Sequence, residues 1–492
     1  MKPAMSTSRP TSPERAAAKL PPYSSIDEPL LAFAEGRHDA HPLRGLRDAG
    51  PYSRDAVAAY TPVVRVATVG PRSGQRQVRD LVASLRNRHP PTDRSEYVPE
   101  YPGFGALLGP DLQLADNPGA HLAWPDDINE LDQLGEDASR RVAAAQAAAI
   151  RRLELVRGSF DVAIVHLPDA WAHACRTPTF DAHDELKALG ALAAIPTQVV
   201  NDRTFTFAYR ASLAWRLSIA LYVKSGGVPW KLAPMPGVPD STAYIGLAYA
   251  LRGDPRDALF VTCCSQVFDA DGGGMQFVAY EARDPVDDVE AARHNPYLSR
   301  QDMRAVLARS LRLYQARNGG AVPTRVAIHK TTGFRPDEVL GATDALEGIR
   351  DVDCLEITTD VAWRAVWLDA PRRPGQRSEP GGYPVRRGTM LPVSGVAALL
   401  WSAGDAPGIS SRGHYYQGGK SIPRPVVLTR YAGSGPLEIP ALEALALTKM
   451  DWNNDALYDP VPVTIRYSQV LARTIARAPW LRRKEYPFRL FM

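Results

Sequence analysis

Three consecutive apolar segments in the second half of the chain set its architecture: AYIGLAYAL (243–251), ALFVTCCSQVF (258–268) and MQFVAYEA (275–282). Short connections containing Gly and Asp separate them, which is typical of antiparallel strands joined by hairpins. The next segment, SRQDMRAVLARSLRLYQAR (299–317), predicts a helix, and RVAIHK (325–330) predicts another strand. Three antiparallel strands, a helix and a parallel strand follow one another in an RNase H-like sheet, and we expect that fold here.

The first half of the chain has a different pattern, in which strands alternate with helices. Strand-like segments are interleaved with segments of helical periodicity, the strands at 65–70, 160–169 and 195–200 and the helices at 76–88, 140–155 and 183–194. FDVAIVHLPD (160–169) is a continuous apolar run, typical of a strand buried on both faces. This alternation predicts a parallel sheet wrapped by helices. The expected fold is therefore α/β, with a Rossmann-like domain before the RNase H-like domain.

We expect the chain to divide into an N-terminal arm at 1–24, a first domain at 25–214 and a second domain at 215–492. The arm is biased toward Ser, Pro, Thr and Ala, a composition that predicts disorder or contact with a partner. The whole chain, with 45% hydrophobic and 23% charged residues, can bury a large core. No apolar run approaches the roughly 18–20 residues that a membrane-spanning helix needs.

The remaining local signals exclude several classes of protein. Four cysteines without a CxxC pair predict reduced, structural thiols and a cytoplasmic location. Two glycine-containing loops, at 70–74 and 417–421, lack the spacing of a nucleotide-binding loop, and HExxH and GxSxG sequences are absent. A net charge of +4 is weak evidence for a polyanionic partner. The arginine surplus after residue 465 fits either contact with a phosphate backbone or a solvated helix face.

Four polar residues in the middle of the chain form the most informative cluster. His183 and Lys187 are four residues apart on a predicted helix, so they share one face. Gln198 lies at the end of the next strand, and Lys224 lies at the C-terminal end of the following helix, before a Gly pair. Two cations, an amide and an imidazole at one end of a sheet suit a terminal phosphate. Spacing alone also allows four ordinary surface side chains.

The sequence around this cluster, HDELK, IPTQVV and YVKSGGVPWKL, resembles the passage from the MID domain to the PIWI domain of prokaryotic Argonautes. The resemblance continues over nearly everything from residue 27 onward, in AYIGLAYAL, ARSLRLYQARNG, RVAIHKTTGF, RGTMLPVSG with WSAG, SIPRPVVL, LTKMDWNNDALYDPVPVTIRYS and YPFRLFM. It implies that His183, Lys187, Gln198 and Lys224 hold the 5′ phosphate of a guide. It further implies that the C-terminal carboxylate of Met492 helps to hold Mg²⁺ at that phosphate.

The sequence departs from active Argonautes where acidic residues hold two catalytic metal ions. The resemblance places the first Asp after an Ile-Gly-hydrophobic triplet, where this chain has Ala248, and the second after a His-basic pair, where it has Thr331. Neither side chain can replace an anionic metal ligand. Asp451 is a candidate for the last acidic position, but one carboxylate cannot hold two ions. The resemblance therefore implies a PIWI domain without nuclease activity and no enzymatic activity in this chain.

The length of the chain fits MID and PIWI domains and a tail, the layout of short prokaryotic Argonautes. Those proteins pair with a separate protein that carries an APAZ region and an effector, which is a TIR or sirtuin-like NAD-consuming domain or a nuclease. The resemblance implies a guide, expected to be RNA, that recognises single-stranded DNA, with Arg203, Arg466 and Arg473 contacting the nucleic-acid backbone. Target binding would activate the partner against plasmids or phage, in a heterodimer that can oligomerise.

Two alternatives come from other classes of protein. The first is an active guided nuclease with unconventional metal ligands, which retained cleavage with Mg²⁺ or Mn²⁺ would support. The second is a small-molecule α/β enzyme with a Rossmann-like half, which would need a cofactor fingerprint that the chain lacks. We therefore expect a binding subunit that itself performs no chemistry.

Overall fold

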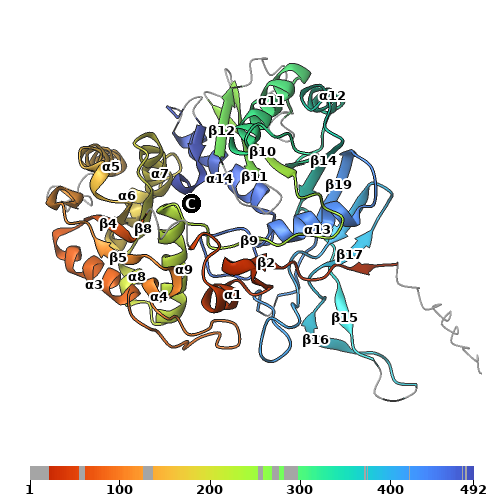
Figure 1. The fold of residues 1–492 in the computed structure, drawn as a ribbon, viewed down its shortest axis with the longest axis horizontal. Helices are drawn as coiled ribbons and strands as arrows, with labels where there is room; N and C mark the ends of the chain where they lie inside the picture. Colours follow the sequence, from red (N-terminus) through yellow and green to blue (C-terminus); the bar gives the residue numbers. More distant parts are fainter. Residues whose placement is uncertain are drawn as a thin grey trace, which may run out of the picture.

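Two lobes, each built on its own β-sheet, lie side by side in the computed structural model of the chain (Figure 1). The structure describes residues 22–54, 61–125, 137–252, 259–268, 276–281, 297–370, 373, 375–419, 421–478, 480–481 and 485–492. Residues 1–21 of the expected arm lie outside this description, as do the side chains of Cys263 and Cys264. Among the described cysteines, Cys175 and Cys354 are free thiols.

The first lobe contains the parallel sheet that the alternating pattern predicts. Its strand order is β5-β4-β7-β8, and β6 also pairs with β4 in parallel. The strands are β4 (Val63–Gly70), β5 (Asp111–Leu114), β6 (His121–Ala123), β7 (Val162–His166) and β8 (Thr197–Val200). The helices are α3 (Gln75–Leu85), α4 (Phe104–Leu108), α5 (Ala138–Glu154), α6 (Ala172–Cys175), α7 (Ala182–Leu192), α8 (Asp202–Thr206) and α9 (Arg210–Lys224).

Strand β7 shows why its sequence is apolar throughout. Val162 and Ile164 pack in a core shared with α3, α4 and α9, whereas Ala163 and Val165 pack on the opposite face with α5. Successive side chains of a strand point to opposite faces, so helices on both faces leave no position for a polar residue. This arrangement confirms the Rossmann-like expectation for the first lobe.

The second lobe contains a ten-stranded mixed sheet in the order β1-β17-β18-β19-β14-β13-β10-β11-β12-β20. Strands β10, β11 and β12 are consecutive antiparallel neighbours, and β13 and β14 run parallel to β10, as in an RNase H-like sheet. The strands are β1 (Ser24–Ser25), β10 (Thr242–Arg252), β11 (Leu259–Phe268), β12 (Gln276–Glu281), β13 (Arg325–Lys330), β14 (Asp351–Thr358), β17 (Thr389–Pro392), β18 (Ala397–Leu400), β19 (Val426–Ala432) and β20 (Glu485–Pro487). The sequence-based expectation for this half is therefore confirmed.

Helices cover both faces of this sheet. Helices α11 (Arg300–Arg317) and α12 (Pro336–Ala345) pack on one face, and α13 (Glu438–Leu447) and α14 (Val463–Arg477) pack on the other. The start of α14 comes so close to β10 that a Cβ at Gly246 would lie 2.1 Å from the carbonyl oxygen of Thr464. The glycine of the Ile-Gly-Leu triplet is thus required by packing.

The N-terminal segment joins the two lobes. Ser24, the last residue of the expected arm, pairs with Met390 at the edge of the large sheet. Strands β2 (Leu31–Ala32), β3 (His38–Asp39) and β9 (Lys231–Leu232) form a small sheet, followed in the chain by α1 (Pro42–Ala49). The expected domain boundary between residues 214 and 215 falls inside α9, whose side chains belong to a core that includes residues of both lobes.

A buried ion cluster anchors this N-terminal segment to the second lobe. The Glu28 carboxylate accepts hydrogen bonds from Arg387 Nε and Lys449 Nζ, each at 2.9 Å. The Lys449 ammonium also donates to the carbonyl oxygens of Pro29 and Ala40. The Arg387 and Lys449 side chains are fully buried. A buried charge is costly unless an opposite charge lies beside it. The Glu28 carboxylate and the two cations therefore hold one another in position.

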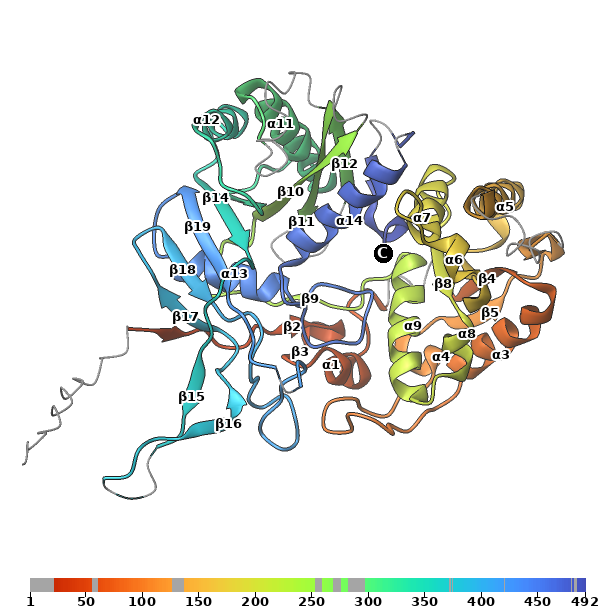
Figure 2. The ribbon, with the colours of Figure 1, turned by 180° about the vertical axis from the view of Figure 1, so that it is seen from behind.

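The Pro-Gly-rich region near residues 371–384 contributes one strand of a hairpin. Strands β15 (Val366–Leu368) and β16 (Pro380–Pro384) pair antiparallel and project from the body of the molecule (Figure 1, Figure 2). The glycines and prolines in and between these strands conceal the short period-two pattern of the hairpin.

None of the described helices combines the length and the apolar character needed to cross a bilayer.

Candidate functional site

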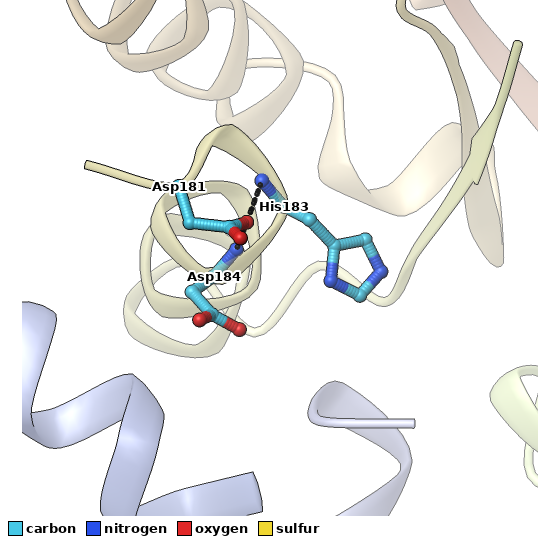
Figure 3. A group of neighbouring side chains, drawn as sticks. All are labelled: Asp181, His183 and Asp184. Carbon is cyan, nitrogen blue, oxygen red and sulfur yellow. Dashed lines mark hydrogen bonds between the residues drawn. The ribbon is translucent and has the colours of Figure 1, made fainter. Parts of the chain in front are cut away.

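Helix α7 presents His183 and Lys187 from its first turns. Asp181 caps the helix by accepting hydrogen bonds from the backbone N–H groups of His183 (3.0 Å) and Asp184 (3.2 Å). The His183 ring projects away from the helix and is exposed to solvent (Figure 3). Neighbouring protein removes part of the hydration of the ring, and together with the charges of Lys187 and Lys224 this lowers the pKa of His183 below its ordinary value. The imidazole is therefore neutral at physiological pH.

Lys187 points into the interface between the lobes. Its side chain is buried, with the residue only 6% exposed, and Nζ donates a hydrogen bond of 2.7 Å to the carbonyl oxygen of Phe491. The short helical turn Phe488–Leu490 brings the C-terminus beside α7 and α9 (Figure 1, Figure 2). Burial lowers the pKa of Lys187 to about 8. Among the described residues, the hydrogen-bond acceptor of this ammonium is thus a neutral oxygen, in a place where the group has lost most of its water.

Lys224 reaches the same region from the last residue of α9. It is 2% exposed, and its Nζ donates to Oε1 of Gln198 on β8 at 2.5 Å. Burial and the charge of Lys187 lower the pKa of Lys224 to about 7. The chain turns sharply after this lysine, because Gly226 has φ +112°, a conformation that side-chain-bearing residues rarely adopt. The Gly pair therefore ends α9 at the point where Lys224 faces β8.

The structure thus brings together the four residues that the sequence singled out. Within the described part of the chain, neither Lys187 nor Lys224 forms an ion pair with a carboxylate. Burying two ammonium groups without a directly paired carboxylate is costly, and this burial lowers the pKa values of both lysines. An anion that enters between them would gain two charge-assisted hydrogen bonds. Such an arrangement would suit a multiply charged anion, for example a phosphate monoester.

A second set of charges lies behind the pocket at the start of α7. Asp184 accepts hydrogen bonds from Arg473 and Arg477 of α14, and Arg477 also pairs with Asp181 at 3.1 Å. Ligand atoms of Asp181, His183 and Asp184 lie within 4.8 Å of one another, the spacing of a metal site. Asp184 is already engaged by Arg473 and Arg477, and Asp181 by Arg477 and by two backbone N–H groups of α7. This cluster fixes α14 against α7 and is poorly suited to holding a cation.

The three arginines expected to contact a nucleic-acid backbone lie in different places. Arg473 pairs with Asp184 at 3.1 Å, close to the pocket, and half of its side chain remains exposed. Arg466 pairs with Asp459 at 3.4 Å, and Arg203 with Asp169 at 3.4 Å at the other end of β8. All three side chains keep solvent-accessible surface. The structure places only Arg473 beside the four-residue cluster.

The oxygen donors of the pocket determine whether it can hold Mg²⁺. Met492 is buried, and its neighbour Phe491 contacts Lys187, so the C-terminus reaches the pocket. Gln198 Oε1 and the Phe491 carbonyl oxygen, however, already accept hydrogen bonds from the two ammonium groups. Mg²⁺ prefers an octahedral shell of oxygens that commonly includes substrate phosphates. Mg²⁺ at this place would therefore depend on oxygens supplied by a phosphate and by the Met492 carboxylate.

The degenerate catalytic positions lie side by side in the large sheet. Leu247 on β10 pairs in parallel with Lys330 on β13, so the next residues, Ala248 and Thr331, stand at the same edge. Lys330 is fully buried and pairs with Glu338 at 2.7 Å. The described residues contain no group of three or more potential metal ligands at this edge.

Asp451 does not offer a free carboxylate. Its Oδ1 accepts hydrogen bonds from the Tyr467 hydroxyl (2.7 Å) and the Asn453 N–H (3.0 Å), and its Oδ2 accepts from Asn454 Nδ2 (2.8 Å). Its charge acts on Lys187 instead, where it favours the protonated form. Asp451 therefore shapes the electrostatics of the pocket on the far side from Asp184.

Sequence reasoning missed Phe491, Asp184 and Asp451 as parts of this site. The carbonyl oxygen of Phe491 carries no side-chain signal, and its contact with Lys187 joins residues 304 positions apart. Asp184 sits next to His183 in the sequence, in the first turn of the helix, where an acid is expected for the helix dipole alone. Only the packing of α14 against α7 reveals its pairing with Arg473.

Comparison with known proteins supports the fold. No protein-family model and no curated protein sequence matches the chain. Its structure is similar to that of Clostridium butyricum Argonaute bound to a guide DNA (5′ deoxycytidine) and a 19-mer target DNA, with a TM-score of 0.66 and 14% sequence identity over 95% of this chain and 54% of that one. The chain thus spans about half the length of the Argonaute it matches.

Two structures of A. aeolicus Argonaute are also similar. The first has a TM-score of 0.58 and 14% identity, over 95% of this chain and 55% of that one. The second, with externally bound siRNA, has a TM-score of 0.56 and 15% identity, over 96% of this chain and 56% of that one. The chain therefore has an Argonaute-like fold, with the arrangement of MID and PIWI domains.

Proposed function

We propose that this chain is a guide-binding subunit of a prokaryotic defence system, of the short Argonaute kind. The observation that carries the proposal is the buried pair of Lys187 and Lys224, which have no carboxylate partner among the described residues and converge with Gln198 and His183. A guide with a 5′ phosphate supplies the missing anion. The Argonaute-like fold of the chain supports the same function.

The pocket would discriminate a phosphate from a hydroxyl by charge. The ammonium groups of Lys187 and Lys224 would turn from the Phe491 carbonyl and Gln198 to the phosphate oxygens, with Gln198 and His183 as further donors. A 5′ hydroxyl would leave both cations without an anion, so it would not offset the cost of burying them. Mg²⁺ held by the Met492 carboxylate would add positive charge at the same phosphate.

The rest of the guide would read its target by base pairing. Arg473, which pairs with Asp184 next to the four residues, and the exposed parts of Arg203 and Arg466 would contact phosphates, which fixes position without reading sequence. We propose an RNA guide and a single-stranded DNA target, and since one similar Argonaute was solved with a guide DNA, both guide types belong in the test. Ala248 and Thr331 leave the PIWI edge without acidic ligands, so target binding would end without cleavage.

Target binding would activate a second protein. We propose a partner with an APAZ region and a TIR, sirtuin-like or nuclease effector, which is activated when target binding changes the contacts between the two chains. Activation of this kind requires that the target bind one state of the complex more tightly than the other. The complex of the two proteins would act against plasmids or phage as a heterodimer that oligomerises.

Guide binding should weaken as the pH rises. The pKa values of Lys187 and Lys224, about 8 and about 7, place both lysines in the neutral form above pH 9, whereas a bound phosphate needs them protonated. Between pH 7 and 9, each lysine that must take up a proton when the guide binds should lower the affinity for a phosphorylated guide by about tenfold per pH unit. Fluorescence anisotropy over this range measures the slope.

The variant Lys224→Arg provides the matched control. A guanidinium stays protonated across the whole range, so its slope should be about one proton smaller than that of the wild type. The 5′-hydroxyl guide should show little dependence on pH in either protein. Identical profiles for phosphorylated and hydroxyl guides would contradict the assignment of the pocket.

The experiment that tests the function as a whole is guided target binding. The chain loaded with a phosphorylated RNA guide should retain a complementary single-stranded DNA and release a scrambled one, and the DNA should remain intact with Mg²⁺ or Mn²⁺. A parallel reaction with a DNA guide identifies the guide type. Cleavage at a fixed position would favour the alternative of a nuclease with unconventional ligands, and equal retention of both DNAs would exclude guided recognition.

A further inference from the structure

A cluster of exposed apolar side chains lies on and beside the β15–β16 hairpin. Trp363 is 61% exposed, and Val366, Trp367 and Leu368 are each close to half exposed. These residues line a groove of about 430 Å³, whose walls also include Tyr23 and Trp401. Large apolar side chains that gather on one surface of a protein commonly mark a place where another chain binds.

The hairpin itself requires such a contact. All three residues of β15 are exposed, so its apolar side chains face solvent on both sides of a two-stranded ribbon. An isolated two-stranded hairpin is marginally stable in water. Trp401 also lines the groove, is 3% exposed, and has an indole N–H without an acceptor among the described residues.

The N-terminal segment of the same chain begins at this groove. Tyr23 packs edge-on against Trp367, with ring centroids 6.5 Å apart. Ser24 and Ser25 continue from it as an edge strand paired with Met390 and Thr389. Residues 21 and 22 are both prolines, which lack the N–H that a longer ladder would need. A longer ladder would lack two donors at these positions, and the described part of the chain begins next to the groove.

The composition of this segment matches an aromatic-lined groove. Leu20-Pro21-Pro22 directly precedes Tyr23, and Pro10 and Pro13 lie further upstream. Tandem prolines favour the polyproline II conformation, whose carbonyl groups carry no internal hydrogen bonds. Grooves lined by aromatic side chains bind segments of this kind, because the extended conformation is already formed.

We propose that residues 13–21 of this chain occupy the groove. Leu20 and Pro21 would pack against the exposed rings of Trp363 and Trp367. The segment would thus cover the apolar hairpin and hold it against the body of the second lobe. This contact does not depend on guide binding, so its test is independent of the function proposed above.

Photo-crosslinking in the full-length chain tests the contact. Replacing Leu20 by p-benzoylphenylalanine should give, on irradiation, an intramolecular cross-link to a peptide containing residues 363–368 or 391–401. The same group at Leu155, which is 85% exposed on the first lobe, is the control and should not label these peptides. Adding Trp363→Ser to the Leu20 probe should lower the yield of the cross-link by about tenfold, the effect of losing one contact of ordinary size.

Hydrogen exchange supplies an independent readout. Amides of residues 364–368 should exchange about tenfold faster in the combined variant Leu20→Asp, Pro21→Gly and Pro22→Gly than in the wild type. Cross-links that join two chains would overturn the proposal in favour of a second copy as occupant. The absence of groove cross-links together with unchanged exchange would overturn it as well, and would leave the groove to a separate protein.

Discussion

Replacing Lys187 and Lys224 by alanine is expected to abolish the preference of the chain for a phosphorylated guide. Each ammonium group would contribute a charge-assisted hydrogen bond to the phosphate, worth about 1.5–3 kcal/mol. Each single variant should therefore lose about tenfold or more in affinity, and the double variant at least about 100-fold. Affinity for the 5′-hydroxyl guide should change little. Anisotropy titrations with the two guides measure both effects.

Lys231→Ala is the matched control for these variants. Lys231 lies seven residues after Lys224, but its ammonium stands over the ring of Tyr52, 4.8 Å from its centroid. Its loss should affect phosphorylated and hydroxyl guides equally. A double variant that folds, as judged by its melting temperature, and still prefers the phosphate would show that the anion binds elsewhere.

Glu28→Gln is expected to lower the free energy of unfolding by about 3–5 kcal/mol, since it leaves two buried cations without their anion. Burial alone would raise the pKa of Glu28, but Arg387 and Lys449 hold it below its ordinary value. The carboxylate is therefore charged at neutral pH, and a neutral amide cannot replace it. Chemical denaturation followed by circular dichroism measures the difference.

The variant Asp27→Asn tests whether burial of the ion pair causes the expected loss of stability in Glu28→Gln. Asp27 precedes Glu28 and pairs with Arg386, the neighbour of Arg387, but its side chain is 96% exposed. Exposed ion pairs contribute about 0–1 kcal/mol, so this variant should unfold close to the wild type. Equal losses for Glu28→Gln and Asp27→Asn would contradict the account of the buried cluster.

Periodic segments made much of the fold predictable. The continuous apolar run at β7 and the helical spacing of His183 and Lys187 each reflect a local rule, and the structure follows both. The order of β10 to β13 followed from short hairpin connections and one crossover helix. Because these elements deliver side chains to one end of the parallel sheet, the cluster of four pocket residues was predictable as well.

Contacts between distant parts of the chain were not predictable in this way. Lys449 and Glu28 are 421 positions apart, and nothing in the sequence near either residue indicates the other. The partner of Lys187 is a main-chain oxygen, which every residue possesses. Arg473 was read as a free contact to nucleic acid, but its pairing with Asp184 depends on how α14 packs against α7. Such pairings follow from tertiary packing, which local patterns do not encode.

The most direct test of the account is the binding of two RNA guides that differ only at the 5′ end. Wild-type chain should bind the 5′-phosphorylated RNA at least about 100-fold more tightly than its 5′-hydroxyl twin, as two charge-assisted hydrogen bonds to the phosphate would give. The preference should persist across a salt series, because the lysines are buried and therefore weakly screened. Equal affinities for the two guides at every salt concentration would contradict the assignment of Lys187 and Lys224 to a phosphate pocket.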